Sequence, residues 1–173
     1  MPSMEAAAPG VLEAHALHVG GLVGNLQSLE IMIRFFLSAL PGARPLGVAY
    51  GTDLFAFPVG TALDESDLTS YESLGDLIDR FNEYASANKI SAIDRSLVKL
   101  RDAIAHGRVS AVAPSDRLRL VKFGPPHDGK VRIEFNEMMT SAWLIEQKQR
   151  VFRAIEIVCA HMPAERLAPA AHS

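Results

Sequence analysis

The segment LRDAIAHGRV, residues 100–109, brings an arginine, an aspartate, a histidine and a glycine together at the end of an apolar, helix-like stretch. The apolar residues around it recur at helical spacing, at Ile93, Leu97, Leu100 and Ile104. This periodicity predicts a helix over residues 91–106. Histidine in the last turn with glycine after it is typical of a helix C-terminus, and we expect Gly107 in the left-handed conformation.

The polar residues of this segment share one side of the predicted helix. At about 100° per residue, Arg101 lies beside the apolar stripe, while Asp102 and His106 lie progressively farther round. Only Val98 and Ala105 fall between them, which leaves a strip of small residues that another surface can approach closely. Asp102 can hydrogen-bond the imidazole four residues later and orient it. The alternative interpretation is that AHG is only a helix cap.

The rest of the chain predicts an all-α helical bundle of four or more main helices, with one small β-hairpin inserted before the last helix. The other helices are predicted over residues 11–40, 68–87 and 137–161, with Tyr71 and Cys159 on buried faces. Alternating segments at 117–123 and 130–135, joined by GPPHDG, predict the hairpin. A single domain over 11–162 is expected, between disordered Ala- and Pro-rich tails at 1–10 and 163–173.

Composition narrows the class of protein further. A single cysteine, Cys159, excludes an internal disulfide and a multi-cysteine zinc site. The chain has no secretory signal pattern, and its apolar runs fall short of the roughly 20 residues that span a bilayer. We therefore expect a soluble cytoplasmic protein that does not enter membranes. His15 and His18 have the spacing of a metal pair but no evident third ligand, so no metal site or other cofactor is predicted.

Positive charge is concentrated around the opening segment. Residues 94–132 contain nine Lys or Arg residues and four Asp residues, a local excess of five positive charges in a chain whose net charge is −3. A basic block within an acidic protein indicates a local site for an anion.

Arg101, four intervening residues, His106 and the following Gly107 resemble the R-x4-6-H signature of the HEPN superfamily, which comprises small all-helical ribonucleases and RNA-associated domains. The order of elements over residues 15–162 is similar too: a long first helix containing LQSLEIMIRFFL, an acidic second helix, the motif at the end of a third helix, and a long final helix. The basic hairpin and the long connection at 41–69 look like elaborations of that layout.

The resemblance implies metal-independent RNA cleavage, in which the ribose 2′-hydroxyl attacks the adjacent phosphate. His106 would move the proton, Arg101 would hold the phosphate, and Asp102 would orient His106. Candidate RNA-binding residues come from the basic block: Arg95, Lys99, Arg108, Arg117, Arg119 and Lys122. No phosphate loop accompanies GGLVG at residues 20–24, so no nucleotide site is expected.

The resemblance also implies partners. We expect RNA as substrate, a homodimer with the third helices near its two-fold axis, and an antitoxin protein if the chain is the toxin of a toxin–antitoxin or defence system. Two alternatives remain at this point: a non-catalytic HEPN-like module that binds RNA or a protein, and a plain helical dimerisation protein. Glu30 and Arg34 are interpreted as an intrahelical pair, or else as polar residues that support the motif.

Overall fold

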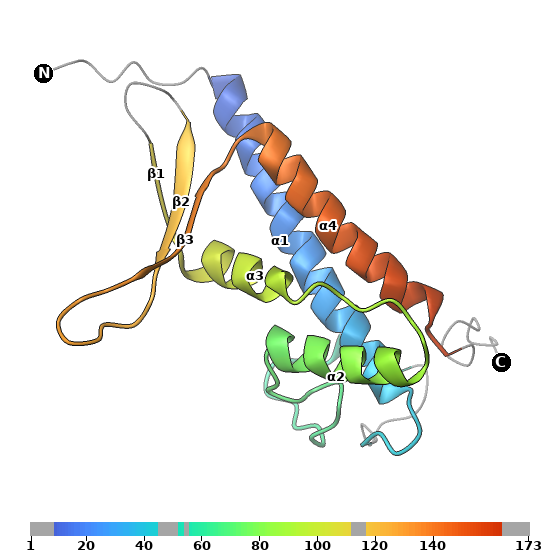
Figure 1. The fold of residues 1–173 in the computed structure, drawn as a ribbon. Coiled ribbons are helices and arrows are strands. Elements are labelled where there is room, and N and C mark those ends of the chain that lie inside the picture. Colours follow the sequence, from blue (N-terminus) through green and yellow to red (C-terminus); the bar gives the residue numbers. More distant parts are fainter. Residues whose placement is uncertain (1–8, 45–51, 54–55, 112–116, 164–173) are drawn as a thin grey trace, which may run out of the picture. The chain divides into compact units, whose positions relative to one another are not determined.

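The computed structural model describes residues 9–44, 52–53, 56–111 and 117–163. Within these ranges lie four helices and three strands, in the order α1 (Pro9–Ser38), α2 (Leu74–Ala87), α3 (Ser96–His106), β1 (Arg108–Ala111), β2 (Leu118–Phe123), β3 (Ile133–Met138) and α4 (Ser141–Ala160) (Figure 1). The strands form one antiparallel sheet in the order β1-β2-β3. The part of the chain that the structure describes is therefore mixed α/β, and the predicted all-α class is wrong.

The strand that the sequence prediction missed is β1. The predicted hairpin is present as β2 and β3, although β3 begins at Ile133 and ends at Met138, three residues later than the predicted segment 130–135. The residues directly after α3 add a third strand, in which Arg108 pairs with Val121 and Ala111 with Leu118. Gly107 has extended backbone angles, φ −73° and ψ 169°, so the chain passes from helix to strand without a loop. All four residues of β1 are exposed, and a strand this short shows no periodicity in the sequence.

The chain divides into two compact units. Unit 1 comprises residues 1–27 and 94–153, and unit 2 comprises residues 28–93 and 154–173. Helices α1 and α4 each contribute residues to both. The tails predicted at 1–10 and 163–173 lie outside the described residues, except for residues 9 and 10, which belong to α1, and residue 163.

Unit 1 packs α3, the sheet and the adjoining parts of α1 and α4 around a shared core. Its buried apolar residues are Leu22, Leu26, Leu97, Leu100, Ala103, Leu120, Met139, Leu144 and Val151. Helix α3 begins at Ser96, not at the predicted residue 91, because the Asp94 carboxylate accepts the Ser96 backbone N–H at 2.8 Å. Arg150 from α4 lies 2.6 Å from the same carboxylate. Hydrogen bonds from Ser96 and Arg150 lower the pKa of Asp94 to about 2.

Unit 2 has an aromatic and aliphatic core between α1 and α2. The ring centroid of Phe36 lies 5.0 Å from that of Phe81 and 5.1 Å from that of Tyr84. Helix α2 starts at Leu74 because Ser73 caps it, in a capping box with Asp76. The chain before Leu74 is therefore not helical, and Tyr71 is fully exposed. The prediction that Tyr71 is buried is wrong.

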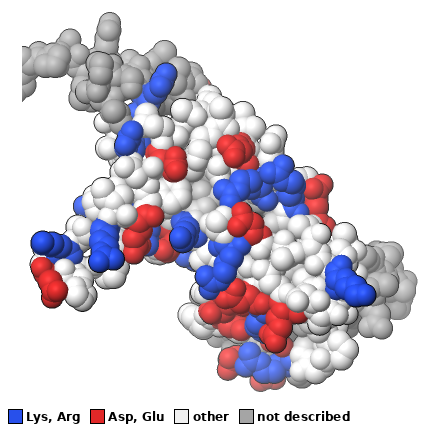
Figure 2. Space-filling view, in the orientation of Figure 1, with Lys and Arg blue, Asp and Glu red and all other residues white. Residues whose placement is uncertain are grey.

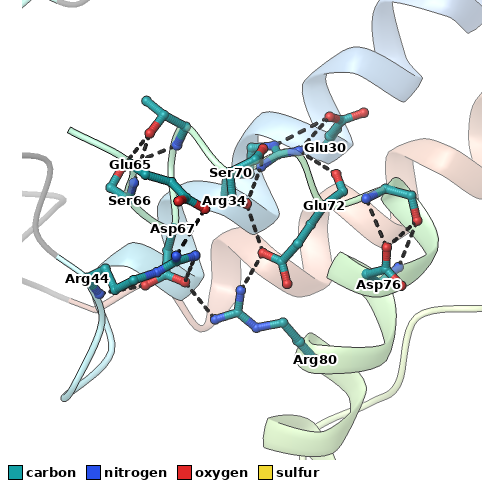
Figure 3. A network of polar contacts seen from close by, with 12 residues as sticks. Glu30, Arg34, Arg44, Glu65, Ser66, Asp67, Ser70, Glu72, Asp76 and Arg80 are labelled. Atoms are coloured by element: carbon teal, nitrogen blue, oxygen red, sulfur yellow. Dashed lines mark hydrogen bonds and ion pairs between the residues drawn. The ribbon is translucent and has the colours of Figure 1, made fainter. Parts of the chain in front are cut away.

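A network of charged side chains holds residues 65–72 in unit 2 (Figure 3). Arg34 of α1 donates to the backbone oxygens of Ser70 at 2.8 Å and Glu72 at 2.7 Å, and it pairs with Glu30 at 3.1 Å. Arg80 of α2 pairs with Glu72 at 2.7 Å and with Asp67 at 2.9 Å. The pair Glu30–Arg34 is thus intrahelical, as interpreted from the sequence, and it also anchors the loop before α2.

Burial alone would raise the pKa of Asp67, but the backbone N–H of Arg44 and the guanidinium of Arg80 donate to its carboxylate, and the net effect lowers this pKa. Asp67 is therefore held in its charged form within the network.

Helix α4 begins where the Thr140 hydroxyl accepts the backbone N–H of Trp143. Its buried residues are Leu144, Gln147, Val151, Ala154 and Val158. Cys159 lies off this face and is exposed, so its predicted burial is wrong. Among the described residues, no helix has the length and apolar character needed to cross a membrane.

Candidate functional site

The end of α3 is fixed by the close approach of β2. The backbone N–H of Gly107 donates to the oxygen of Ala103 at 2.7 Å, which closes the last turn. A side chain at this position would clash with that oxygen and with the side chain of Leu120 on β2. The prediction of a left-handed Gly107 is wrong, since its φ is −73°. Glycine is required here because the Ala103 carbonyl oxygen and the Leu120 side chain leave no room for a β-carbon.

We expect Gly107→Ala to lower the free energy of unfolding by about 2 kcal/mol, because the added methyl group forces α3 and Leu120 apart. Urea denaturation followed by circular dichroism measures the change. Gly20→Ala in α1 is the matched control: a methyl group there meets nothing within 4 Å, and alanine favours helix by about 1 kcal/mol over glycine. Equal or greater stability of Gly107→Ala would show that the close approach is not required.

The three proposed catalytic residues lie on the exposed side of α3. Arg101 is exposed, and it has no hydrogen-bond or ion-pair partner in the described part of the chain. The side chains of Asp102 and His106 are 39% and 63% exposed. The distance from His106 Nε2 to Asp102 Oδ1 is 3.8 Å, too long for a hydrogen bond. The two side chains are within ion-pair distance, but the hydrogen bond expected to orient His106 is not formed.

Asp102 instead contacts a lysine from the sheet. Lys122 Nζ lies 2.7 Å from Asp102 Oδ2, and it also forms an ion pair with Glu134 of β3. Hydrogen bonds to these two carboxylates raise the pKa of Lys122, and Asp102 has the larger effect. Sequence analysis placed Lys122 among the RNA-binding residues, but its charge is balanced here by two carboxylates.

Glu134 is the member of this cluster that sequence reasoning missed. It lies near the irregularity in the pairing of β2 with β3, twelve residues from Lys122. The only signal in the sequence was an acidic residue inside an otherwise basic alternating segment, KVRIEF.

The other predicted RNA-binding residues are spread over α3, the sheet and the residues next to them. Arg95 and Lys99 are exposed at the start of α3, and Arg117 is exposed just before β2. Arg108 and Arg119 lie on the sheet, with Arg108 stacked over the ring of Phe123 at 5.3 Å from its centroid. Basic and acidic side chains are interspersed over the visible face of the molecule (Figure 2).

The histidine pair of α1 contacts a lysine. His18 Nδ1 lies 3.0 Å from Lys148 Nζ of α4, so the imidazole accepts a hydrogen bond from the ammonium group. The pKa of His15 is lowered by burial and by the neighbouring His18. Within the described ranges, no group of three or more His, Cys, Asp or Glu side chains is placed to hold a metal ion.

The arrangement at the end of α3 allows acid–base chemistry on an anion. Arg101 offers a fixed positive charge and a planar set of donors that suits phosphate oxygens. His106 offers an imidazole, which can accept and donate a proton. Both side chains face solvent and neither belongs to the buried stripe, so a bound ligand can reach them. Comparisons with known proteins find no match for this chain among family models, curated proteins or solved structures.

Proposed function

We propose that this chain is a metal-independent endoribonuclease of the HEPN type, with its chemistry at the C-terminal end of α3. Arg101 and His106 lie five residues apart on α3, and both are exposed. They lie outside the core formed by Leu97, Leu100 and Ala103. This exposure is the observation that supports the proposal. Residues that the fold does not need, yet that carry the charge and the proton-transfer group of the motif, are better explained by a ligand than by packing.

In the proposed reaction, His106 accepts the proton of a ribose 2′-hydroxyl. The 2′ oxygen then bonds to the adjacent phosphorus, and the bond from phosphorus to the 5′ oxygen of the next nucleotide breaks. The leaving 5′ oxygen takes up the proton that His106 accepted, which returns the imidazole to its starting form, so the products carry a 2′,3′-cyclic phosphate and a 5′-hydroxyl. Arg101 binds the phosphate and stabilises the charge that develops on its oxygens. Asp102 contributes less, because Lys122 already occupies one of its oxygens.

The proposal extends to partners. A cytoplasmic homodimer would bring two copies of α3 together along the strip of Val98 and Ala105. Val98 is half-buried and Ala105 is exposed. Two motifs facing a shared cleft would double the positive charge on the substrate. As the toxin of a toxin–antitoxin or defence system, the chain would be blocked by an antitoxin protein that covers this cleft.

A second candidate is a non-catalytic HEPN-like module that binds RNA or a protein. It is favoured by the 3.8 Å separation of His106 Nε2 from Asp102, because an imidazole that no carboxylate orients is a weaker base for catalysis.

The test is cleavage of single-stranded RNAs of mixed sequence by the purified full-length chain, with EDTA present throughout. We expect fragments with 2′,3′-cyclic phosphate and 5′-hydroxyl ends, and no cleavage of the same sequences carrying 2′-O-methyl groups, which cannot attack the phosphate. Cleavage that EDTA abolishes would contradict the mechanism. Binding of RNA without any cleavage would select the second candidate.

A further inference from the structure

The two faces of the sheet in unit 1 differ in what covers them. On the inner face, Leu120 packs against the end of α3, Lys122 contacts Asp102 of that helix, and Phe135 contacts the ring of Trp143 of α4. Cross-strand partners share a face. The register therefore places the alternate residues on the other side, here called the outer face: Arg108, Ser110, Arg119, Val121, Phe123, Ile133, Asn136 and Met138.

Direct contacts confirm that these side chains lie together. Arg119 donates from Nη1 to Asn136 Oδ1 at 3.1 Å and from Nε to Met138 Sδ at 3.3 Å. The Arg108 guanidinium lies over the ring of Phe123. The outer face thus has a continuous surface formed from all three strands.

The outer face combines exposed apolar groups with positive charge. Phe123 is 40% exposed and Ile133 is 60% exposed. Neither acidic residue of β3 pairs with an outer-face residue: Glu137 pairs with Leu120, and Glu134 binds Lys122. Neither Arg108 nor Arg119 has a carboxylate as its cross-strand partner. The positive charge of these two arginines makes the outer face complementary to an anion.

The chemistry of the face selects one kind of anion. An exposed aromatic ring with a guanidinium group near it suits an unpaired base, because bases stack on aromatic rings and on arginine side chains, and arginines also suit phosphates. Bases inside a duplex are already stacked on one another and cannot use such a surface. A purely acidic ligand would have no apolar group to pack against the exposed side chains of Phe123 and Ile133.

We propose that the outer face binds single-stranded RNA, with a base stacked at Phe123 and phosphates held by Arg108 and Arg119. This inference rests on the proposed function, since it assigns a binding surface for the substrate of that site. It adds an aromatic residue to the basic residues predicted from the sequence, and it leaves out Lys122, which is on the inner face.

The experiment measures binding of the full-length chain to a fluorescein-labelled, single-stranded 2′-O-methyl RNA by fluorescence anisotropy. The 2′-O-methyl groups prevent cleavage, so binding is read independently of catalysis. We expect Phe123→Ala to weaken binding by about 5- to 100-fold, the usual effect of removing a stacked aromatic. Arg108→Ala and Arg119→Ala should each weaken binding and flatten its dependence on the logarithm of salt concentration by about 0.7.

Matched controls lie on α4, away from the sheet. Phe152 is a half-exposed aromatic and Arg153 an exposed base of the same unit, and alanine at either position should leave binding unchanged. Circular dichroism checks that each variant is folded. Ultraviolet crosslinking of wild type to a natural RNA, followed by mass spectrometry, should place crosslinks on the three strands, within residues 108–111, 118–123 or 133–138, and needs no variant.

The outcomes separate this inference from the proposed function. If wild type cuts RNA but the sheet variants bind as wild type does, the outer face is not the RNA surface and the catalytic proposal stands. If binding depends on Phe123 while no RNA is cut, the surface is supported and the catalytic proposal fails. Crosslinks confined to other segments, or equal affinity for duplex and single strand, would overturn the inference.

Discussion

Replacing His106 with alanine is expected to reduce the rate of RNA cleavage by about 10²- to 10⁴-fold while leaving the chain folded. The imidazole is 63% exposed and lies outside the buried residues of α3, so its removal leaves no cavity. Its interaction with the negative end of the helix contributes roughly 1 kcal/mol or less to stability. Single-turnover cleavage rates and urea denaturation measure the two effects separately.

His127→Ala is the matched control for this variant. His127 lies in the loop between β2 and β3 and its side chain is 90% exposed, so its loss should change neither cleavage nor stability. Arg101→Lys adds a second comparison, because lysine keeps the charge but lacks the planar set of donors that binds two phosphate oxygens at once. Cleavage by the His106 variant at the wild-type rate would show that the catalytic assignment is wrong.

Long periodic segments were the most predictable part of the fold. Thirty residues of α1 follow one helical period, and the predicted range of 11–40 lies close to the observed Pro9–Ser38. Where side chains hydrogen-bond to the backbone, the observed start of a helix differs from the predicted start by several residues. Ser73 starts α2 and Asp94 delays α3, and neither effect shows in the spacing of apolar residues.

The fold class failed on contacts between distant segments. Strand β1 exists because β2, seven or more residues later in the sequence, pairs with it. A sequence pattern depends on residues that are close along the chain. The four residues of β1 are all exposed, so they show no alternation of apolar and polar residues that would predict a strand. Gly107 was correctly predicted to end the helix, but the reason for glycine there was only partly visible in the sequence: a β-carbon would meet the Ala103 carbonyl oxygen of the last turn and also the side chain of Leu120 on β2.

The candidate site was predictable in its exposure and unpredictable in its pairing. Angular spacing placed Arg101 and His106 off the buried stripe, and both are exposed. The i,i+4 spacing of Asp102 and His106 allowed a hydrogen bond, yet Lys122 is the closer partner of Asp102. A lysine twenty residues away reaches Asp102 only because β2 folds back onto α3. Local geometry therefore gives the set of groups at a site, and tertiary structure decides which of them interact.

The largest loss of stability is expected from Arg34→Ala, at about 3 to 5 kcal/mol, because each buried acceptor left without its donor costs about 1 to 3 kcal/mol. Arg34 is 8% exposed and supplies donors to Glu30, to Ser70 and to the backbone oxygen of Glu72. Without it, these oxygens lose their donor at sites that water reaches poorly, and the loop before α2 loses its attachment to α1. Urea denaturation measures the change.

Arg44→Ala tests whether burial sets this cost. Arg44 belongs to the same network, but its side chain is 50% exposed and its nearer partner, Glu65, is 72% exposed. Water screens that pair, and the backbone N–H that binds Asp67 at 2.7 Å survives the substitution, so we expect a loss of about 1 kcal/mol or less. Arg34→Met keeps much of the apolar bulk while removing the donors, and it should remain nearly as unstable as Arg34→Ala. Similar losses for Arg34→Ala and Arg44→Ala, or full stability of Arg34→Met, would show that the buried donors do not hold this loop.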